Sequence, residues 1–279
     1  MICNICPRHC DIAPGKIGAC RARICSEDSK TIYALNYGKV TAAALDPIEK
    51  KPLRRFRPGS MIFSTGSFGC NLTCPFCQNH KISMTDVKRS IYKEVNPYQL
   101  LDAAERMKEA GNIGIAFTYN EPLIGYEFIL DCARLFKRAG MDVVLVSNGY
   151  ICKEPLDDLL PYIDAMNIYL KAFNKEFYER IGGDIETVKN TIYLASKECH
   201  VEVTTLIIPG ENDSEEEMKR EAEWLALTGE RSGKDIPLHI SRFFPAYDYS
   251  GKTATDISAV YKLADIARRS LKYVYTGNC

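Results

Sequence analysis

Three cysteines in the sequence stand close enough together to bind one metal centre. Cys70, Cys74 and Cys77 are spaced Cys-x3-Cys-x2-Cys, just after the apolar run 61–66. A cubic 4Fe–4S cluster has four irons, each of which normally takes one cysteine. Three thiolates in so tight a loop leave one iron without a protein ligand, and an open coordination position marks a reactive metal site. The alternatives are half of a structural zinc site or a set of buried free thiols.

The spacing also carries a family resemblance. A zinc knuckle uses Cys-x2-Cys with a distant Cys or His pair, so a spacing of three and then two is unusual for one. It resembles the signature of the radical S-adenosylmethionine (radical SAM) enzymes. That resemblance implies that the open iron chelates S-adenosylmethionine (SAM). Reductive cleavage then gives methionine and a 5′-deoxyadenosyl radical, which abstracts hydrogen from a substrate. It also implies that the ring of Phe76 packs near the adenine.

A second group of cysteines opens the chain. Cys3, Cys6, Cys10 and Cys20 are spaced Cys-x2-Cys-x3-Cys-x9-Cys, with a proline and two glycines that provide turns. Four thiolates in about twenty residues fit tetrahedral zinc or a fully ligated iron–sulfur cluster. The spacing predicts a metal site and does not separate zinc from iron–sulfur. Unligated surface cysteines are the alternative, although exposed free thiols are a chemical liability.

The elements that position these motifs follow from the hydrophobic pattern. Strand-like apolar runs alternate with amphipathic helical stretches, which is typical of parallel βαβ units. The expected strands cover 61–66, 113–119, 142–147, 165–171, 201–208 and 236–241. Six such units, together with the resemblance, predict an α/β fold with a partial (β/α)6 TIM-like barrel of the radical SAM type. Reactive groups of such barrels gather where strands end.

The ends of the second, third and fourth strands carry polar motifs. Asn120 and Glu121 precede a proline where radical SAM enzymes have Gly-Gly-Glu-Pro, and the resemblance implies that this motif binds the amino group of SAM. Ser147 and Asn148 resemble the Thr-Asn-Gly of glycyl-radical activases, which contacts ribose and methionine. Lys171 is expected to meet the SAM carboxylate as a point charge. The alternatives are a helix cap for Glu121 and a plain Asn-Gly turn.

The last two strands provide further candidates. Residues 204–213 form an apolar wall and a turn, in which Ile208 is expected to face the adenine. His239 and Arg242 are expected toward the barrel mouth as substrate or cofactor contacts. A lone histidine on a strand is more often a satisfied core residue, so both roles stay open.

Motifs along nearly the whole chain resemble one subgroup. The chain looks like the AmmeMemoRadiSam-system radical SAM enzymes, which are related to pyruvate formate-lyase activating enzyme. The resemblance rests on Cys3–Cys20, Asp46–Leu53, Arg57–Ser60, Cys77–Asn79, Tyr119–Pro122 and His239–Pro245. It implies an oxidoreductase or activase working under anaerobic conditions, with an electron donor such as flavodoxin or ferredoxin. The substrate is a small molecule or a protein. A glycyl-radical activase is one alternative function, and a non-catalytic zinc or iron–sulfur module is another.

Composition bounds the remaining possibilities. The chain has 279 residues, with 36 Lys and Arg balancing 36 Asp and Glu. A net charge of zero means that the chain lacks the excess of basic residues expected of a protein that binds nucleic acid or an anionic membrane. No signal peptide is recognisable, so twelve cysteines suggest reduced thiols and a cytoplasmic protein. We expect a Cys-rich N-terminal module over 1–57, which includes a hairpin over 31–45 with its turn near 36–39, and the barrel over 58–279.

Overall fold

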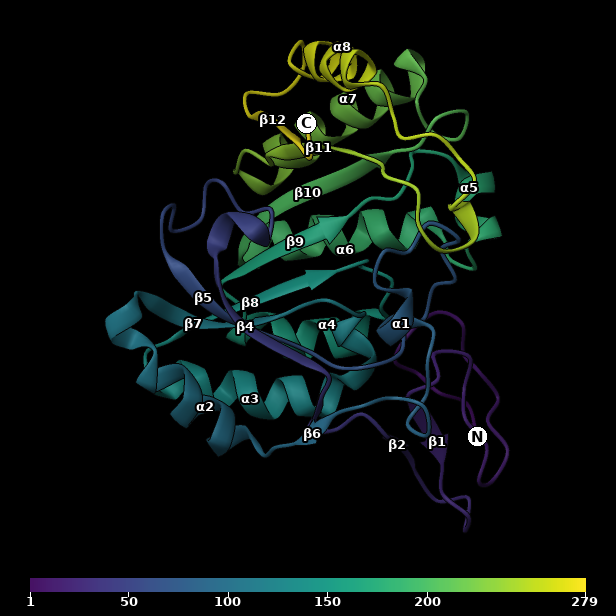
Figure 1. The fold of residues 1–279 in the computed structure, drawn as a ribbon, viewed down its shortest axis with the longest axis vertical. Helices are drawn as coiled ribbons and strands as arrows, with labels where there is room; N and C mark the ends of the chain where they lie inside the picture. The colour runs from purple at the N-terminus through teal and green to yellow at the C-terminus, as the bar shows by residue number, and fades with distance from the viewer.

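The computed structural model describes residues 1–279 and is built on one large sheet (Figure 1). The sheet has eight strands in the order β12-β11-β10-β9-β8-β7-β5-β4. All neighbours are parallel except β4, which runs antiparallel to β5. The strands are β1 (Arg23–Cys25), β2 (Ile32–Ala34), β3 (Lys39–Val40), β4 (Ala42–Pro47), β5 (Met61–Gly66), β6 (Lys93–Glu94), β7 (Asn112–Phe117), β8 (Asp142–Ser147), β9 (Ala165–Tyr169), β10 (His200–Ile207), β11 (Leu238–Arg242) and β12 (Val274–Gly277).

Helices fill the connections between the parallel strands. They form an arc around one side of the sheet, from α2 and α3 through α4 and α6 to α7 and α8 (Figure 1). The α-helices are α1 (His80–Ser83), α2 (Pro97–Arg106), α3 (Tyr126–Arg138), α4 (Lys153–Leu159), α5 (Lys175–Arg180), α6 (Ile185–Glu198), α7 (Glu215–Ser232) and α8 (Ile257–Ala267). The 3-10 helices are η1 (Ile48–Lys50), η2 (Lys108–Ala110), η3 (Pro122–Gly125), η4 (Leu160–Tyr162) and η5 (Tyr247–Tyr249). No helix is both long and apolar enough to cross a bilayer.

The predicted fold class is confirmed. All six expected strands form, as β5, β7, β8, β9, β10 and β11, and they lie next to one another in that order. Local signals bound the helices between them. Asn96 and Gln99 form a capping box at the start of α2, and Gly233 ends α7 with a φ of +73°.

The main core lies between the sheet and its helices. The central strands are apolar on both faces. Val143 and Leu145 face the main core, and Val144, on the opposite face of the same strand, packs with Ile48 and Leu53 in a smaller cluster. Helix α3 contributes a buried face that includes Phe128 and Phe136. Each buried methylene stabilises the fold by about 0.8 kcal/mol. The sum over this core holds the strand ends in fixed positions.

The N-terminal part differs from the expected hairpin. β2 pairs with β1 rather than with the strand that follows it, and β3 pairs with β6 from beyond the first barrel strand. β4 joins the main sheet along β5. The hairpin predicted over 31–45 was wrong, because β2 pairs with the strand just before it while β3 and β4 pair with strands beyond residue 60. The division at residue 57 stays a prediction, and β4 lies on its N-terminal side while pairing within the main sheet.

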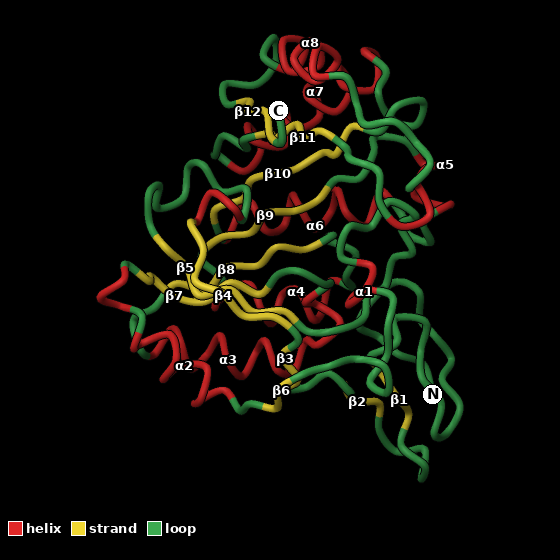
Figure 2. The backbone as a smooth tube through the Cα atoms, viewed as in Figure 1, coloured by secondary structure: helices red, strands yellow, loops and turns green.

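The carboxyl ends of the parallel strands meet along one edge of the sheet. Strands β8, β9 and β10 point toward the edge that carries α1 and α5, at the right of Figure 1. This edge consists mostly of loops, and the N-terminal segment lies beside them (Figure 2). Loops at this edge are where functional groups of such folds collect.

Candidate active site

The cluster loop, residues 67–79, joins β5 to α1 and carries Cys70, Cys74 and Cys77. Cys74 is buried, and Cys70 and Cys77 are half-buried. All three line one cavity of about 240 Å³. No three His, Cys, Asp or Glu side chains in the protein are gathered tightly enough to hold a single ion. Cysteines spread over a cavity wall suit a cluster, in which each thiolate binds a different iron.

The surroundings of Cys70 and Cys74 oppose ionisation of their thiols. Burial raises the pKa of Cys74 to about 11, while the charge of Lys171 acts against that shift. Burial also raises the pKa of Cys70, and the nearby Glu121 carboxylate adds to the effect. Such thiols stay protonated by themselves and need a metal cation to hold them as thiolates.

Backbone contacts fix the cluster loop. Gly69 has a φ of +87°, and a Cβ there would stand 2.6 Å from the carbonyl oxygen of Cys20. Only glycine tolerates both that backbone and that approach. The Cys70 N–H donates to the same carbonyl at 3.2 Å, and the Thr73 N–H donates to the carbonyl of Ile181 at 2.9 Å. The loop is therefore held by the N-terminal segment and by the end of α5.

Glu121 joins the ends of β7 and β8. Its carboxylate accepts from the Ser147 hydroxyl at 2.8 Å, the Asn148 N–H at 2.7 Å and the Leu123 N–H at 3.0 Å. Glu121 is only 3% exposed. Burial raises its pKa, while these three donors and the charge of Lys171 oppose the rise. The bond to Leu123 caps η3, so the capping role exists together with a place in the cavity wall.

Asn148 links this carboxylate to the cluster loop. Its side-chain N–H group donates to Asn71 Oδ1 at 2.9 Å and to Cys70 Sγ at 3.7 Å. Its side-chain oxygen accepts from the Tyr150 N–H at 2.8 Å. Gly149 has a φ of +70°, which glycine adopts without strain, and the backbone here directs the Asn148 amide toward a cysteine of the cluster loop.

Asn120 and Tyr119 shape the wall after β7. Asn120 Oδ1 accepts from the Ser67 N–H at 2.8 Å, and Nδ2 donates to the carbonyl of Gly69 at 3.1 Å. Tyr119 has a φ of +71° and so adopts a backbone conformation that glycine would take more easily. Its hydroxyl donates to Asp46 Oδ2 at 2.9 Å, which anchors the strained residue.

Lys171 and Tyr169 lie on the wall formed by the end of β9. Lys171 Nζ lies 4.1 Å from the centre of the Tyr169 ring, and both residues line the cavity. The cavity therefore has a cation near Cys74 and a buried carboxylate, Glu121, among its wall residues. Such a pair of charges suits a zwitterionic ligand with one ammonium and one carboxylate group.

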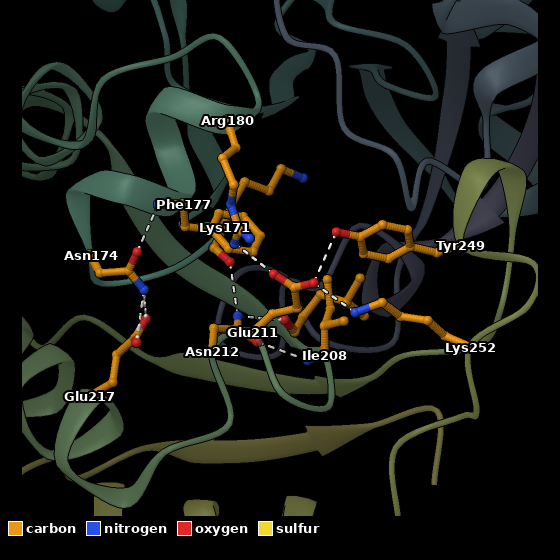
Figure 3. Close-up of polar contacts among 11 residues, drawn as sticks. Lys171, Asn174, Phe177, Arg180, Ile208, Glu211, Asn212, Glu217, Tyr249 and Lys252 are labelled. Atoms are coloured by element: carbon orange, nitrogen blue, oxygen red, sulfur yellow. Dashed lines mark hydrogen bonds and ion pairs between the residues drawn. The ribbon is translucent and has the colours of Figure 1, made fainter.

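The loop after β10 is braced around Glu211 (Figure 3). Its carboxylate accepts from Arg180 Nη2 at 2.6 Å, Lys252 Nζ at 2.6 Å and the Tyr249 hydroxyl at 2.9 Å. Burial opposes these donors, which nevertheless lower the pKa of Glu211. The Tyr249 ring packs on Phe76 with centroids 6.1 Å apart. Phe76 is buried and lines the cavity, where the sequence had placed it.

Ile208 does not lie in the cavity wall. Its N–H donates to Asn212 Oδ1 at 2.8 Å, and Asn212 Nδ2 donates to the carbonyls of Lys171 and Leu206, each at 2.9 Å (Figure 3). Ile208 is fully buried, whereas Leu206 lines the cavity. The residue of this stretch that lines the cavity is therefore Leu206, inside β10, and not the expected Ile208, which follows the strand.

His239 and Arg242 lie away from the cavity, contrary to expectation. His239 sits near the start of β11, and its Nε2 lies 2.6 Å from Glu202 Oε2. Arg242 Nε donates to the carbonyl of Thr255 at 2.7 Å. The role of His239 as a satisfied core residue is the one that the structure supports, because a side chain at the amino end of a strand cannot reach the carboxyl edge.

Two cavity residues escaped the sequence analysis. Ser241 and Asn278 line the cavity, and Asn278 Nδ2 donates to Ser241 Oγ at 3.0 Å. Asn278 follows β12, which pairs with β11. No sequence signal marked this residue, because its place depends on the last strand joining the sheet.

Comparisons with known proteins agree with this geometry. Residues 65–222, more than half of the chain, match the model of the radical SAM superfamily. An uncharacterized protein of Methanocaldococcus jannaschii is 39% identical over 279 residues, covering 99% of this chain and 80% of the relative. Pyruvate formate-lyase 1-activating enzyme of Escherichia coli is 26% identical over 166 residues, covering 58% of this chain and 67% of the relative.

A solved structure shares the fold. SuiB of Streptococcus suis, bound to S-adenosylmethionine, superposes with a TM-score of 0.57 at 13% identity, covering 76% of this chain and 49% of that one. The match supports the fold alone. Because the superfamily match covers the cluster loop and strands β7 to β10, the chain belongs to the radical SAM superfamily and is related to the pyruvate formate-lyase activating enzymes.

Proposed function

We propose that this protein is a radical SAM enzyme whose 240 Å³ cavity holds a 4Fe–4S cluster and SAM. One observation carries the proposal. Cys70, Cys74 and Cys77 share their cavity with Glu121, the Asn148 turn and Lys171. The lining contains no fourth cysteine and no histidine, so the protein offers three ligands for four irons.

The residues present fit both groups. When bound, the cluster and SAM would supply a 5′-deoxyadenosyl radical that abstracts a hydrogen atom from a substrate. Lys171 would bind the carboxylate of SAM as a point charge. The buried Glu121 would complement its ammonium group and hold Ser147 and Asn148 in position. Phe76 and Leu206 would provide apolar walls for the adenine.

Asn148 would also tune the cluster ligand. Its amide N–H donates to Cys70 Sγ, and hydrogen bonds to a ligating sulfur are one lever on the potential of an iron–sulfur centre. We propose a small one-electron carrier, of the flavodoxin or ferredoxin class, as the reductant. Its approach would be toward the loop edge of the sheet, where Gln78 and Asn79 of the cluster loop are exposed.

The first prediction tests the cluster itself. Cys74→Ala removes the most buried of the three thiols. We expect the rate of SAM cleavage to fall by more than about 100-fold. This is a larger loss than is typical when a residue that only orients a metal ligand is replaced. The measurement is 5′-deoxyadenosine released from SAM by anaerobically reconstituted protein with dithionite.

Cys132→Ala is the matched control, because Cys132 is buried in α3 away from the cavity. It should keep its cluster spectrum and its activity. Undiminished 5′-deoxyadenosine formation by Cys74→Ala contradicts the proposal. So does an electron paramagnetic resonance spectrum of the wild-type cluster that SAM leaves unchanged, and that outcome favours a non-catalytic module.

The likeness to pyruvate formate-lyase 1-activating enzyme favours a second candidate. In this version the hydrogen atom comes from the backbone of a partner protein, and the product is a stable protein radical. Incubation with a candidate glycyl-radical partner labelled with deuterium at glycine separates the two versions. Deuterium in 5′-deoxyadenosine supports the activase, and label recovered only from a small molecule supports the first version.

A further inference from the structure

The four cysteines at the start of the chain surround a cavity of their own. Cys3, Cys6, Cys10 and Cys20 all line it, together with Arg23. The first, second and fourth are buried, with exposed fractions of 6%, 7% and 7%, and Cys10 is half-buried. They do not belong to a loose surface leader, because a folded segment buries three of them and half-buries the fourth.

Backbone turns bring these cysteines together. The Cys3 N–H donates to the carbonyl of Cys10 at 2.9 Å, and the His9 N–H donates to the carbonyl of Cys6 at 3.1 Å. His9 has a φ of +40°, an uncommon backbone conformation for a residue with a side chain. The first three cysteines are thus held by a closed loop, and the fourth reaches them from the turn before β1.

An unpaired donor faces the same cavity. Arg23 is 3% exposed, and its Nε has no hydrogen-bond partner. The two terminal nitrogens are satisfied by Glu127, at 2.8 Å and 2.6 Å, and by the carbonyl of Ile124 at 3.1 Å. A buried N–H without a partner is costly, and such a group in a native fold often marks an acceptor supplied by a ligand.

We propose that Cys3, Cys6, Cys10 and Cys20 bind one metal centre as thiolates, with Arg23 Nε donating a hydrogen bond to a ligating sulfur. Four thiolates around Zn²⁺ or around a 4Fe–4S cluster carry net negative charge, which the buried guanidinium offsets. Zn²⁺ and an iron–sulfur cluster share this thiolate chemistry. Because no three of these side chains already converge on one ion position, binding of either would draw the four sulfurs together around the cavity that they line. The proposal does not depend on SAM chemistry at the other three cysteines.

The proposed centre lies directly behind the cluster loop. The Cys70 N–H donates a hydrogen bond to the carbonyl of Cys20, and Arg8 Nε donates to the carbonyl of Asn71 at 2.7 Å. Arg21 Nη1 donates to the carbonyl of Cys70 at 3.4 Å. Binding of metal would therefore order the segment against which the first cluster ligand rests. This is a positioning role for the centre, exerted through the backbone.

The test uses a full-length variant that lacks the other cluster. In C70A/C74A/C77A the cluster loop has no thiol left, and Cys3, Cys6, Cys10 and Cys20 are the remaining cysteines that share one cavity. We expect this protein, purified anaerobically and reconstituted with zinc or with iron and sulfide, to hold one centre per chain by elemental analysis. A colourless protein with one zinc identifies a single ion, and a brown protein with about four irons identifies a cluster.

Further variants assign the ligands. Adding Cys6→Ser or Cys20→Ser to this background should remove the metal, whereas adding Cys199→Ser, a buried cysteine at the end of α6, should not. Arg23→Lys should keep the stoichiometry and release metal to a chelator several-fold faster. Circular dichroism checks that each variant is folded.

Three outcomes overturn the proposal. The first is a folded C70A/C74A/C77A protein that takes up neither metal. The second is metal that survives the loss of both Cys6 and Cys20. The third is metal that Cys199→Ser removes equally well. None of these depends on SAM cleavage, so failure here is distinguishable from failure of the proposed enzymatic function.

Discussion

At the scale of single residues, the site combines groups that are costly to bury alone. Glu121 keeps its carboxylate inside the protein because three donors surround it. Cys70 and Cys74 sit where burial opposes ionisation, so their thiolate forms require a metal. Lys171 supplies the cationic side chain of the same wall. These features favour a charged, zwitterionic ligand over an apolar one.

A residue-scale prediction concerns Lys171→Met. The change removes the cation but keeps a flexible apolar chain beside Tyr169. Loss of a hydrogen bond to a charged group costs about 1.5–3 kcal/mol, so SAM should bind about 10-fold to 100-fold more weakly. Equilibrium binding of SAM to the reconstituted protein measures this. Lys108→Met, on the surface at η2, is the control and should bind normally. Equal affinities for the two variants would exclude Lys171 from the site.

At the scale of elements, polar side chains tie the strand ends and loops to one another. Glu211 joins the loop after β10 to α5 and η5, and Glu202 ties β10 to β11 at the opposite end of the sheet. Glu202 also accepts from the backbone N–H groups of Arg54 and Arg55, at 3.0 Å and 2.7 Å. The connector before β5 is thereby fixed under the sheet.

Glu202 gives a prediction about stability and pH. Burial alone would raise its pKa, but hydrogen bonds from His200, His239 and two backbone N–H groups lower the pKa to about 2. A carboxyl with a depressed folded-state pKa stabilises the fold above its unfolded pKa of about 4.3, and that stability is lost as pH falls toward 2. The contribution is about 3 kcal/mol near neutral pH.

Urea unfolding between pH 2 and pH 7 measures this contribution. Glu202→Gln should lower the free energy of unfolding near pH 7 and flatten its decline in acid. Glu230→Gln, at an exposed position of α7, should leave both the value and the slope as in the parent protein. A Glu202→Gln protein with the parent's acid slope contradicts the assignment.

At the scale of the whole molecule, the N-terminal segment and the barrel act as one unit at the cluster loop. The Arg23–Glu127 ion pair, at 2.6 Å, joins β1 to α3, and the arginine side chain is 4% exposed. Removing one partner of a buried pair leaves an uncompensated charge. Because Glu127 itself is 38% exposed, solvent screens part of that cost.

Glu127→Gln should therefore loosen the N-terminal segment without unfolding the barrel. We expect a loss of about 1–2 kcal/mol of local stability, below the range for fully buried pairs. Hydrogen exchange of residues 1–35 measures it and should quicken by about 10-fold or more, with β8 and β9 unaffected. Glu109→Gln, on the surface at η2, should change nothing. Uniform protection in both variants contradicts this coupling.

The sequence alone determined the six parallel strands, their order and the three-cysteine loop, because these depend on local hydrophobic pattern and spacing. It also marked Glu121, Ser147, Asn148, Lys171 and Phe76, which follow directly on strand ends or the loop. Only the tertiary structure decided that Leu206 rather than Ile208 faces the cavity, that His239 pairs with Glu202, and that Asn278 reaches the wall. The same holds for the closeness of Cys20 to Cys70 and for the pairing of β3 with β6. These contacts join residues far apart in the chain or depend on side-chain direction, and no local pattern encodes them.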